Sequence, residues 1–399
     1  MEINTLKDIP EIKGKKILLR VDFNVPRNDD GTVKDDSRIQ AALPTIKELQ
    51  SKGARLIVMS HLGRPKGEIV EDLRVTKVAE YFAEVLGHPV KKLDEVIGVN
   101  VKKAVSAMKD GDVIMLENTR FHAEEKSCDE KFAKELASLG EIFVNDAFGA
   151  AHRRHASTAG VAEHLPSYGG FLMEKEIAAL SPLLEEDIAR PLVMIFGGAK
   201  VDTKVGVIKS FIEKADYFLI GGAIANTFLK AAGHEVGESL YEEDKVKLAR
   251  EIMMECEKMK TDIILPHDVV AASKISEDAE TAHVTISDIL GDMKILDIGK
   301  WTAEKFCNII DGAGTVIWNG PLGLTEIEAF QGGTEAVANF LAKKQGITSI
   351  IGGGDTADAI KQLNIPPDAF THISTGGGAC LEFLEGKDLP GIAVLKKTK

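Results

Sequence analysis

Short apolar segments alternate with longer amphipathic segments along almost the whole chain. The first series of apolar segments lies at residues 16–21, 56–59, 113–116 and 142–144. Between them, residues 37–49 and 75–86 carry apolar side chains at helical spacing. A second series of apolar segments lies at residues 192–196, 217–220, 263–265, 316–318, 349–351 and 371–374. This alternation predicts βαβ units, and therefore an α/β fold in which helices cover mostly parallel sheets.

One segment between the two series has a different character. Residues 173–188 are rich in Glu, Leu and Ala and contain no Gly. We interpret this segment as a hinge helix that joins two Rossmann-like lobes, because a single sheet would exceed the usual limit of about ten strands. The alternative is one more helix within a single domain. The preferred interpretation gives an N-terminal domain at residues 1–172 and a C-terminal domain at residues 189–383.

Composition narrows the class of protein. Of 399 residues, 44% are hydrophobic and 28% are charged, as in an ordinary globular protein. The net charge of −13 argues against non-specific binding to nucleic acid or to anionic membranes. The 4 cysteines form no CxxC pair, so neither a disulfide scaffold nor a zinc ribbon is expected. The chain begins without signal-peptide features and has no apolar run long enough to cross a bilayer. We therefore expect a cytoplasmic protein with small-molecule partners.

Polar residues follow the predicted strands of the first half, where ligands of open α/β sheets bind. These candidates are Asp22, Phe23, Asn24, His61, Leu62, Gly63, Arg64, Arg120 and Arg153, with Arg38 at the first helix and His122 and His152 as further candidates. Arginine offers a planar fork of donors that matches phosphate and carboxylate groups. In an acidic chain, arginines at successive strand ends predict a pocket for a small polyanion. The alternative is a set of surface arginines paired with nearby Asp and Glu.

Glycine-rich turns follow the predicted strands of the second half, at residues 197–200, 221–222, 352–356 and 375–378. Glycine lets the backbone approach a ligand, and a helix that begins just beyond presents unpaired N–H groups. Several such turns in one domain predict a nucleotide site. Neither GxxxxGK[ST] nor GxGxxG is present, which argues against a P-loop and the usual dinucleotide site. Asp355 is a candidate Mg²⁺ ligand and equally a helix N-cap, and Glu326 is a candidate for ribose hydroxyls.

The two halves together predict phosphoryl transfer between an anion-binding domain and a nucleotide-binding domain. The chain also carries sequence motifs at residues 20–26 (RVDFNVP), 61–65 (HLGRP), 117–122 (ENTRFH), 197–204 (GGAKVDTK), 318–323 (WNGPLG), 352–356 (GGGDT) and 374–382 (STGGGACLE). In order and spacing these motifs resemble phosphoglycerate kinase over essentially the whole chain. The resemblance implies a two-lobed monomer whose tail, residues 384–399, returns to the N-terminal lobe. It also implies the glycolytic reaction in which 1,3-bisphosphoglycerate and ADP give 3-phosphoglycerate and ATP, reversibly and with Mg²⁺.

The resemblance also implies roles for individual residues. The phosphoglycerate site is matched by Asp22, Phe23, Asn24, Arg38, His61, Leu62, Gly63, Arg64, Arg120 and Arg153. The nucleotide site is matched by Lys204, Gly221, Gly222, Gly299, Glu326, Gly353, Gly354, Asp355 and Thr356, with Asp355 at the metal. The transferring phosphoryl group is expected to be stabilised by Arg38, Lys200, Gly376, Gly377 and Gly378.

Two alternatives from other classes remain. One is a catalytically silent, nucleotide-dependent binding protein on the same scaffold, and the presence of Arg38, Lys200 and Asp355 argues against it. The other is a different enzyme, such as an acyl-phosphate phosphatase or a nicotinamide-dependent dehydrogenase. The missing dinucleotide pattern and the lack of a nucleophile constellation argue against both of these enzymes.

Overall fold

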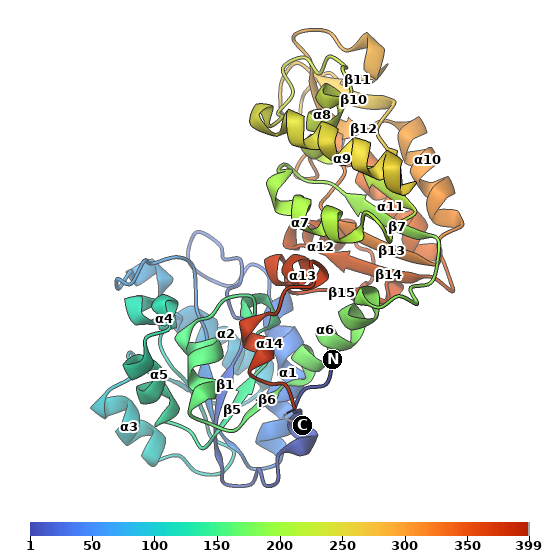
Figure 1. The fold of residues 1–399 in the computed structure, drawn as a ribbon. Helices are drawn as coiled ribbons and strands as arrows, with labels where there is room; N and C mark the ends of the chain where they lie inside the picture. The colour runs from blue at the N-terminus through green and yellow to red at the C-terminus, as the bar shows by residue number, and fades with distance from the viewer. Residues whose placement is uncertain (398–399) are drawn as a thin grey trace. The chain divides into compact units, whose positions relative to one another are not determined.

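The structure, a computed structural model, describes residues 1–397 and divides the chain into two compact units. Unit 1 comprises Met1–Ala178 together with the segment from Asp388 onward, and unit 2 comprises Ala179–Lys387 (Figure 1). Compared with the expected domains, residues 173–178 belong to unit 1 and residues 384–387 belong to unit 2. No helix among the described residues is long and apolar enough to cross a membrane.

Unit 1 is built on a parallel six-stranded sheet. Its strands are, in spatial order, β3 (Val90–Lys92), β4 (Val113–Met115), β2 (Arg55–Met59), β1 (Lys16–Arg20), β5 (Ile142–Asn145) and β6 (Ser167–Gly169). The edge strands β3 and β6 were not predicted, because VKK and SYG carry too few apolar residues to be recognised. The central strands are buried on both faces, which is why they read as continuous apolar runs.

Helices cover both faces of this sheet. Alternate residues of β1 point to opposite faces, so Ile17 and Leu19 join one apolar cluster and Leu18 joins the other. The first cluster includes buried residues of α1 (Ser37–Ser51) and α2 (Thr76–Leu86). The second includes buried residues of α3 (Val99–Ser106) and α5 (Glu130–Ala137). A single turn, α4 (Ala123–Ser127), precedes α5.

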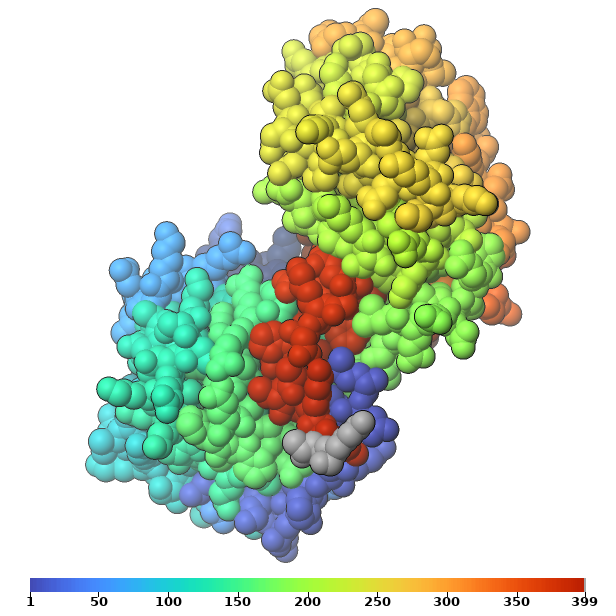
Figure 2. All heavy atoms as spheres, in the orientation of Figure 1, coloured from blue at the N-terminus to red at the C-terminus, as the bar shows by residue number. Residues whose placement is uncertain are grey.

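The first residues of the chain and the segment that ends at residue 397 lie side by side on unit 1 (Figure 2). Asn4 N donates to Leu395 O at 2.8 Å, and Ile3 and Lys396 form an antiparallel bridge. The short helix α14 (Pro390–Ala393) is held near the end of β5, because Asn145 Nδ2 donates to Gly391 O at 3.0 Å. Residues 388–397 therefore belong to unit 1, and Leu389, Ile392 and Leu395 are buried there.

Unit 2 also contains a parallel six-stranded sheet. Its spatial order is β9 (Asp262–Ile264), β8 (Tyr217–Ile220), β7 (Leu192–Phe196), β13 (Thr315–Asn319), β14 (Thr348–Gly352) and β15 (His372–Ile373). Counted along the chain, this is the 3-2-1-4-5-6 order of doubly wound nucleotide-binding folds. The helices of unit 2 are α7 (Asp202–Phe211), α8 (Gly222–Ala231), α9 (Val246–Met259), α10 (Lys300–Asp311), α11 (Gly332–Lys343), α12 (Gly354–Gln362) and α13 (Gly378–Leu384).

A second, antiparallel sheet in unit 2 was not expected from the sequence. It has three strands in the order β11 (Ala282–Thr285), β10 (Asp268–Ala272) and β12 (Lys294–Ile298). Polar residues interrupt β11 (AHVT) and charged residues interrupt β12 (KILDI), so neither strand shows a clean apolar run. The two mostly parallel, helix-covered sheets agree with the predicted fold class, and the antiparallel sheet adds to it.

The expected hinge helix is shorter than predicted. The α-helix α6 spans Phe171–Leu180, and a 3-10 helix follows at Ser181–Leu184. The prediction of one helix reaching residue 188 was therefore wrong. Pro182 explains the end of α6, because proline lacks an N–H and disfavours helical geometry in the residue before it.

Candidate active site

The carboxyl ends of three neighbouring strands meet at one edge of the sheet in unit 1. Arg20, the last residue of β1, pairs in register with Met59 of β2 and Asn145 of β5. Asp22 and His61 each follow two residues beyond the ends of their strands. The order of strands reverses between β1 and β5, which is where ligands bind in open α/β sheets. The register thus brings together residues that the sequence only placed at separate strand ends.

Asp22 holds the guanidinium of Arg38 at this edge. Asp22 Oδ2 accepts a hydrogen bond from Arg38 Nη1 at 2.7 Å, and the Arg38 side chain remains 32% exposed. Asp22 Oδ1 is buried, lies 3.7 Å from His61 Nδ1 and accepts no hydrogen bond within residues 1–397. One contact therefore orients Arg38 and leaves most of its five donors available to an anion.

Arg20 is a buried cation that the sequence analysis did not select. Arg20 is the last residue of β1, and its side chain is 0% exposed. Arg20 Nε donates to Ser157 Oγ at 2.9 Å, and Nη2 lies 3.0 Å from His61 Nδ1. Burial lowers the pKa of Arg20, and the carboxylates of Glu125 and Asp22 oppose that shift. The one available signal was the position of Arg20 at the start of the RVDFNVP motif.

Positive charge is concentrated at this edge of unit 1. Burial lowers the pKa of His61 well below its usual range, and the guanidinium groups of Arg20 and Arg120 lower it further. Burial and the same two guanidinium groups lower the pKa of His155 to about 3. Burial also lowers the pKa of Arg120 to about 10, with further contributions from Arg20 and Arg153. Arginine and histidine side chains from separate strand ends thus form one basic cluster in a chain whose net charge is −13.

The loop after β2 is tied to its neighbours through Gly63. Gly63 N donates to Asn24 Oδ1 at 2.8 Å, and Gly63 O accepts a hydrogen bond from Arg120 Nη1 at 2.8 Å. Gly63 has φ of +62°, which favours glycine at this position. Arg120 Nε is buried and makes no hydrogen bond within the described part of the chain. An unpaired buried donor beside this loop is suited to a ligand oxygen.

The other predicted residues of unit 1 fall into two groups. Arg64 and Arg153 are exposed, and Arg153 Nε donates to His152 Nε2 at 3.0 Å. Phe23 and Leu62 are buried. The Phe23 ring packs edge-on against the ring of Phe82, with 5.1 Å between the two ring centroids. His122 was a further candidate, but its ring centroid lies 4.9 Å from that of Phe132 in the apolar core. We therefore place His122 with the core rather than with the site.

In unit 2, a cavity of about 620 Å³ lies where the order of strands reverses between β7 and β13. The turns after β7, β13, β14 and β15 line it, as do the first residues of three helices. Among the predicted residues it contains Lys200, Lys204, Gly353, Gly354, Asp355, Thr356, Gly377 and Gly378. The glycine-rich turns therefore converge on one cavity.

Lys204 is the buried cation of this cavity. Lys204 Nζ donates to Asn319 Oδ1, and Lys204 is 9% exposed. Burial lowers the pKa of Lys204 to about 8, and the negative charge of Asp355 opposes the shift. Asn319 Nδ2 is buried and donates no hydrogen bond within residues 1–397. The cavity therefore presents a cation, an unpaired amide donor and the first turn of α12 to an anion.

A magnesium ion fits this cavity only with help from a ligand. No group of three or more His, Cys, Asp and Glu within residues 1–397 could hold a metal ion. Mg²⁺ bound to nucleotide phosphates needs just one or two protein carboxylates. Asp355 is exposed in the first turn of α12 and lines the cavity, so its carboxylate fits that role.

Several predicted residues have structural tasks. The Thr356 hydroxyl accepts from Gly320 N at 2.7 Å and donates to Gly352 O at 3.0 Å, so it is occupied by backbone groups. Gly376 N donates to Ser374 Oγ at 3.1 Å. A Cβ at Gly299 would lie 2.2 Å from Asp268 Oδ2.

The remaining predicted nucleotide residues lie away from the phosphate cavity. Gly221 and Gly222 pack against the loop at Leu322, because Gly222 N donates to Leu322 O at 2.7 Å. Glu326 is exposed and does not line the cavity described above. Their contacts with adenosine remain predictions.

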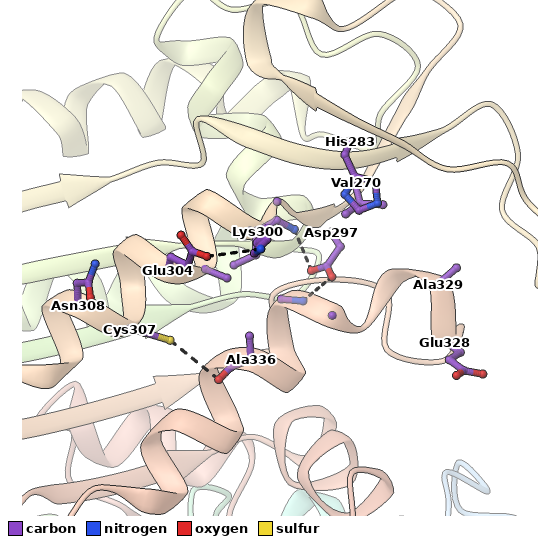
Figure 3. Close-up of a pocket in the computed structure, with 15 residues that line it drawn as sticks. Val270, His283, Asp297, Lys300, Glu304, Cys307, Asn308, Glu328, Ala329 and Ala336 are labelled. Carbon is purple, nitrogen blue, oxygen red and sulfur yellow. Dashed lines mark hydrogen bonds and ion pairs between the residues drawn. The ribbon is translucent and has the colours of Figure 1, made fainter.

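A separate groove of about 580 Å³ runs between α10 and α11 (Figure 3). Lys300, Glu304 and Cys307 line it from α10, and Ala336 lines it from α11. Of the predicted site residues, Gly299 alone borders this groove. The groove is therefore distinct from the phosphate cavity of unit 2.

One chain thus joins an α/β unit that carries a cluster of arginine and histidine side chains to an α/β unit with a glycine-lined cavity at its sheet edge. These features define the class of small-molecule phosphotransferases. Comparisons with known proteins specify the family within that class: the model of the family "Phosphoglycerate kinase" matches residues 6–387. The chain belongs to the phosphoglycerate kinase family. It is therefore a phosphotransferase with a carboxyl group as acceptor, and the alternative of a silent binding protein is not favoured.

Individual relatives agree with this assignment. The phosphoglycerate kinase of Dictyoglomus turgidum is 53% identical over 386 residues, covering 97% of this chain and 96% of that protein. The phosphoglycerate kinase structure from Coxiella burnetii has a TM-score of 0.85 at 38% identity and covers 99% of both chains. That from Pyrococcus horikoshii has a TM-score of 0.88 at 35% identity and covers 98% of both chains. The predicted family and two-lobed α/β fold are confirmed.

Proposed function

We propose that this protein transfers a phosphoryl group reversibly between 1,3-bisphosphoglycerate and ADP, with Mg²⁺, as a monomer in the cytoplasm. The basic pocket of unit 1 would bind the phosphoglycerate, and the phosphate cavity of unit 2 would bind the nucleotide. The observation that carries this proposal is the concentration of guanidinium groups around His61 in an acidic chain. A trianionic substrate such as 3-phosphoglycerate suits such a pocket.

In unit 1, the proposed division of labour follows from the exposure of each group. Arg64 and Arg153 are exposed and would meet the distant phosphate of phosphoglycerate, together with His61 and Arg120. Asp22 would act mainly through Arg38, since one carboxylate oxygen already holds that guanidinium. Asn24 keeps its Nδ2 donor for the glycerate oxygens, because its Oδ1 accepts from Gly63 N.

In unit 2, Lys204, Gly353 and Gly354 would bind the nucleotide phosphates, and the N–H groups at the start of α12 would add to this binding. Asp355 would hold Mg²⁺, which neutralises phosphate charge when it is bound. Gly221, Gly222, Gly299 and Glu326 are proposed to contact the adenosine.

An acyl phosphate is already activated, so this chain needs no covalent intermediate. Its task is to align the donor and acceptor oxygens and to stabilise the charge of the transferring group. We assign this task to Arg38 of unit 1, to Lys200 of unit 2, and to the backbone of Gly376–Gly378. Residues 171–184, where the units join, are the proposed hinge that lets the two bound substrates meet. Identical small-angle scattering with and without both substrates would contradict the hinge.

The central experiment is an Arg38→Ala variant in a coupled assay with 3-phosphoglycerate and MgATP. Loss of one charge stabiliser of the transition state lowers kcat by about 100- to 1000-fold. Calorimetry should give an unchanged Kd for MgADP, since that site lies in unit 2. Arg55→Ala is the matched control, because Arg55 begins β2 at the opposite edge of the same sheet. A near-normal kcat for Arg38→Ala would refute the assignment.

A further inference from the structure

A chain of buried polar contacts runs behind the anion pocket of unit 1. Ser157 N and Oγ both donate to the Glu125 carboxylate, at 3.0 Å and 2.6 Å respectively. Ser157 Oγ in turn accepts from Arg20 Nε at 2.9 Å. Glu125, Ser157 and Arg20 are each 0% exposed. A carboxylate buried this completely needs a positive partner, and Arg20 supplies it through the hydroxyl.

The other end of this chain of contacts is His61. Arg20 Nη2 lies 3.0 Å from His61 Nδ1, and an arginine nitrogen donates but does not accept. His61 Nδ1 must therefore accept, and the ring hydrogen resides on Nε2. A hydrogen on Nδ1 would oppose the arginine N–H, and the nearest carboxylate oxygen, Asp22 Oδ1, is 3.7 Å away.

Three sides of the Arg20 guanidinium are thus fixed. Ser157 Oγ and His61 Nδ1 take two sides, and the carbonyl of Val21 accepts from Nη1 on the third. His155 Nδ1 lies 3.7 Å from Glu125 Oε1, so the same carboxylate also faces the second buried imidazole. Glu125 is therefore the counter-charge at the back of the pocket.

We propose that Glu125 is a positioning residue of the phosphoglycerate site, which through Ser157 and Arg20 holds His61 as the neutral tautomer with hydrogen on Nε2. The role of His61 rests on the function proposed above. In this arrangement His61 offers the substrate a hydrogen-bond donor of fixed direction rather than a mobile positive charge. Glu125 acts from 0% exposure and does not touch the substrate.

The tautomer is tested first in the unmodified protein. Proton–nitrogen correlation NMR of ¹⁵N-histidine protein at pH 7, with His61 assigned through His61→Gln, reports which ring nitrogen carries hydrogen. We expect hydrogen on Nε2 alone. Hydrogen on Nδ1, or on both nitrogens, would overturn the proposal. This measurement needs no substrate, so it stands even if the protein fails to turn over 3-phosphoglycerate, a result that would instead refute the proposed function.

Variants then test the positioning. Glu125→Gln keeps the size of the side chain, and Glu124→Gln is the matched control at the exposed neighbour in the same turn. Weakening a charge-assisted contact should lower kcat/KM for 3-phosphoglycerate about tenfold and mix the His61 tautomers, with the KM for nucleotide unchanged. Ser157→Ala removes the bridging hydroxyl and should also lower kcat/KM for 3-phosphoglycerate and mix the His61 tautomers. This variant tests the positioning role if Glu125→Gln does not fold. Unchanged His61 signals, or equal losses for both substrates, would refute the positioning role.

Discussion

Asp146 provides a quantitative test of how the fold holds α6, the helix within the proposed hinge. The residue follows β5, and its Oδ1 accepts from Leu172 N at 2.9 Å and from Met173 N at 3.2 Å. It therefore satisfies two N–H groups in the first turn of α6. Its side chain is fully buried, and Oδ2 accepts no hydrogen bond in the described part of the chain. Burial raises the pKa of Asp146 to about 7.

The sign and size of the effect follow from proton linkage. An unfolded aspartate loses its proton near pH 4, whereas folded Asp146 keeps it until about pH 7. Between these values the folded state binds more protons, so the free energy of unfolding falls as pH rises. Well between the two pKa values, each pH unit costs about 1.4 kcal/mol. This slope levels off near pH 7, so the loss between pH 5 and pH 7 is about 2 kcal/mol. Asp146→Asn keeps the Oδ1 acceptor and removes the titration, so the variant should gain that amount over the wild type.

Amide hydrogen exchange is the suitable assay, because both tryptophans, Trp301 and Trp318, lie in unit 2 and would not report on unit 1. Exchange of the β1 and β5 peptides from pH 5 to pH 8, corrected for intrinsic rates, gives the unfolding free energy of unit 1. The exposed Asp187→Asn is the control. A difference between Asp146→Asn and the wild type that stays flat with pH, or shrinks as pH rises, would refute the reasoning.

Two further predictions concern unit 2. Because Lys204 has a pKa of about 8, binding of MgADP should weaken as pH rises from 7 to 9 by about tenfold, whereas Lys204→Met should bind weakly without that dependence. Calorimetry at both pH values tests this, with exposed Lys209→Met as the control, and a pH-independent Kd for the wild type would contradict it. Gly299→Ala should destabilise unit 2 by about 1–3 kcal/mol, because its Cβ would meet the buried carboxylate of Asp268. Gly312→Ala, with its nearest atom at 3.9 Å, should be neutral, so equal urea midpoints by tryptophan fluorescence would count against the predicted clash.

Local patterns in the sequence determined most of the elements of the fold. Strands such as β7, Leu192–Phe196, are buried on both faces, so their apolar runs were visible without knowledge of any partner. The strands that were missed, such as β11 and β12, contain polar or charged residues, and both pair with β10 in the folded protein. Helix ends were also less certain, as α6 shows. Pairing and capping depend on distant residues, which a periodicity does not record.

The candidate site divides in the same way. The sequence by itself determined which turns carry arginine, glycine and aspartate. These residue types are recognisable candidates because arginine and glycine-rich turns suit phosphate groups, and aspartate suits Mg²⁺. Only the tertiary structure decided that β1 lies between β2 and β5, so that Asp22 and His61 meet. It also decided that Arg20 is a buried partner of Glu125, which lies far along the chain from it. The sequence states which side chains can carry a charge. Their burial and their counter-charges depend on how segments far apart in the chain pack together.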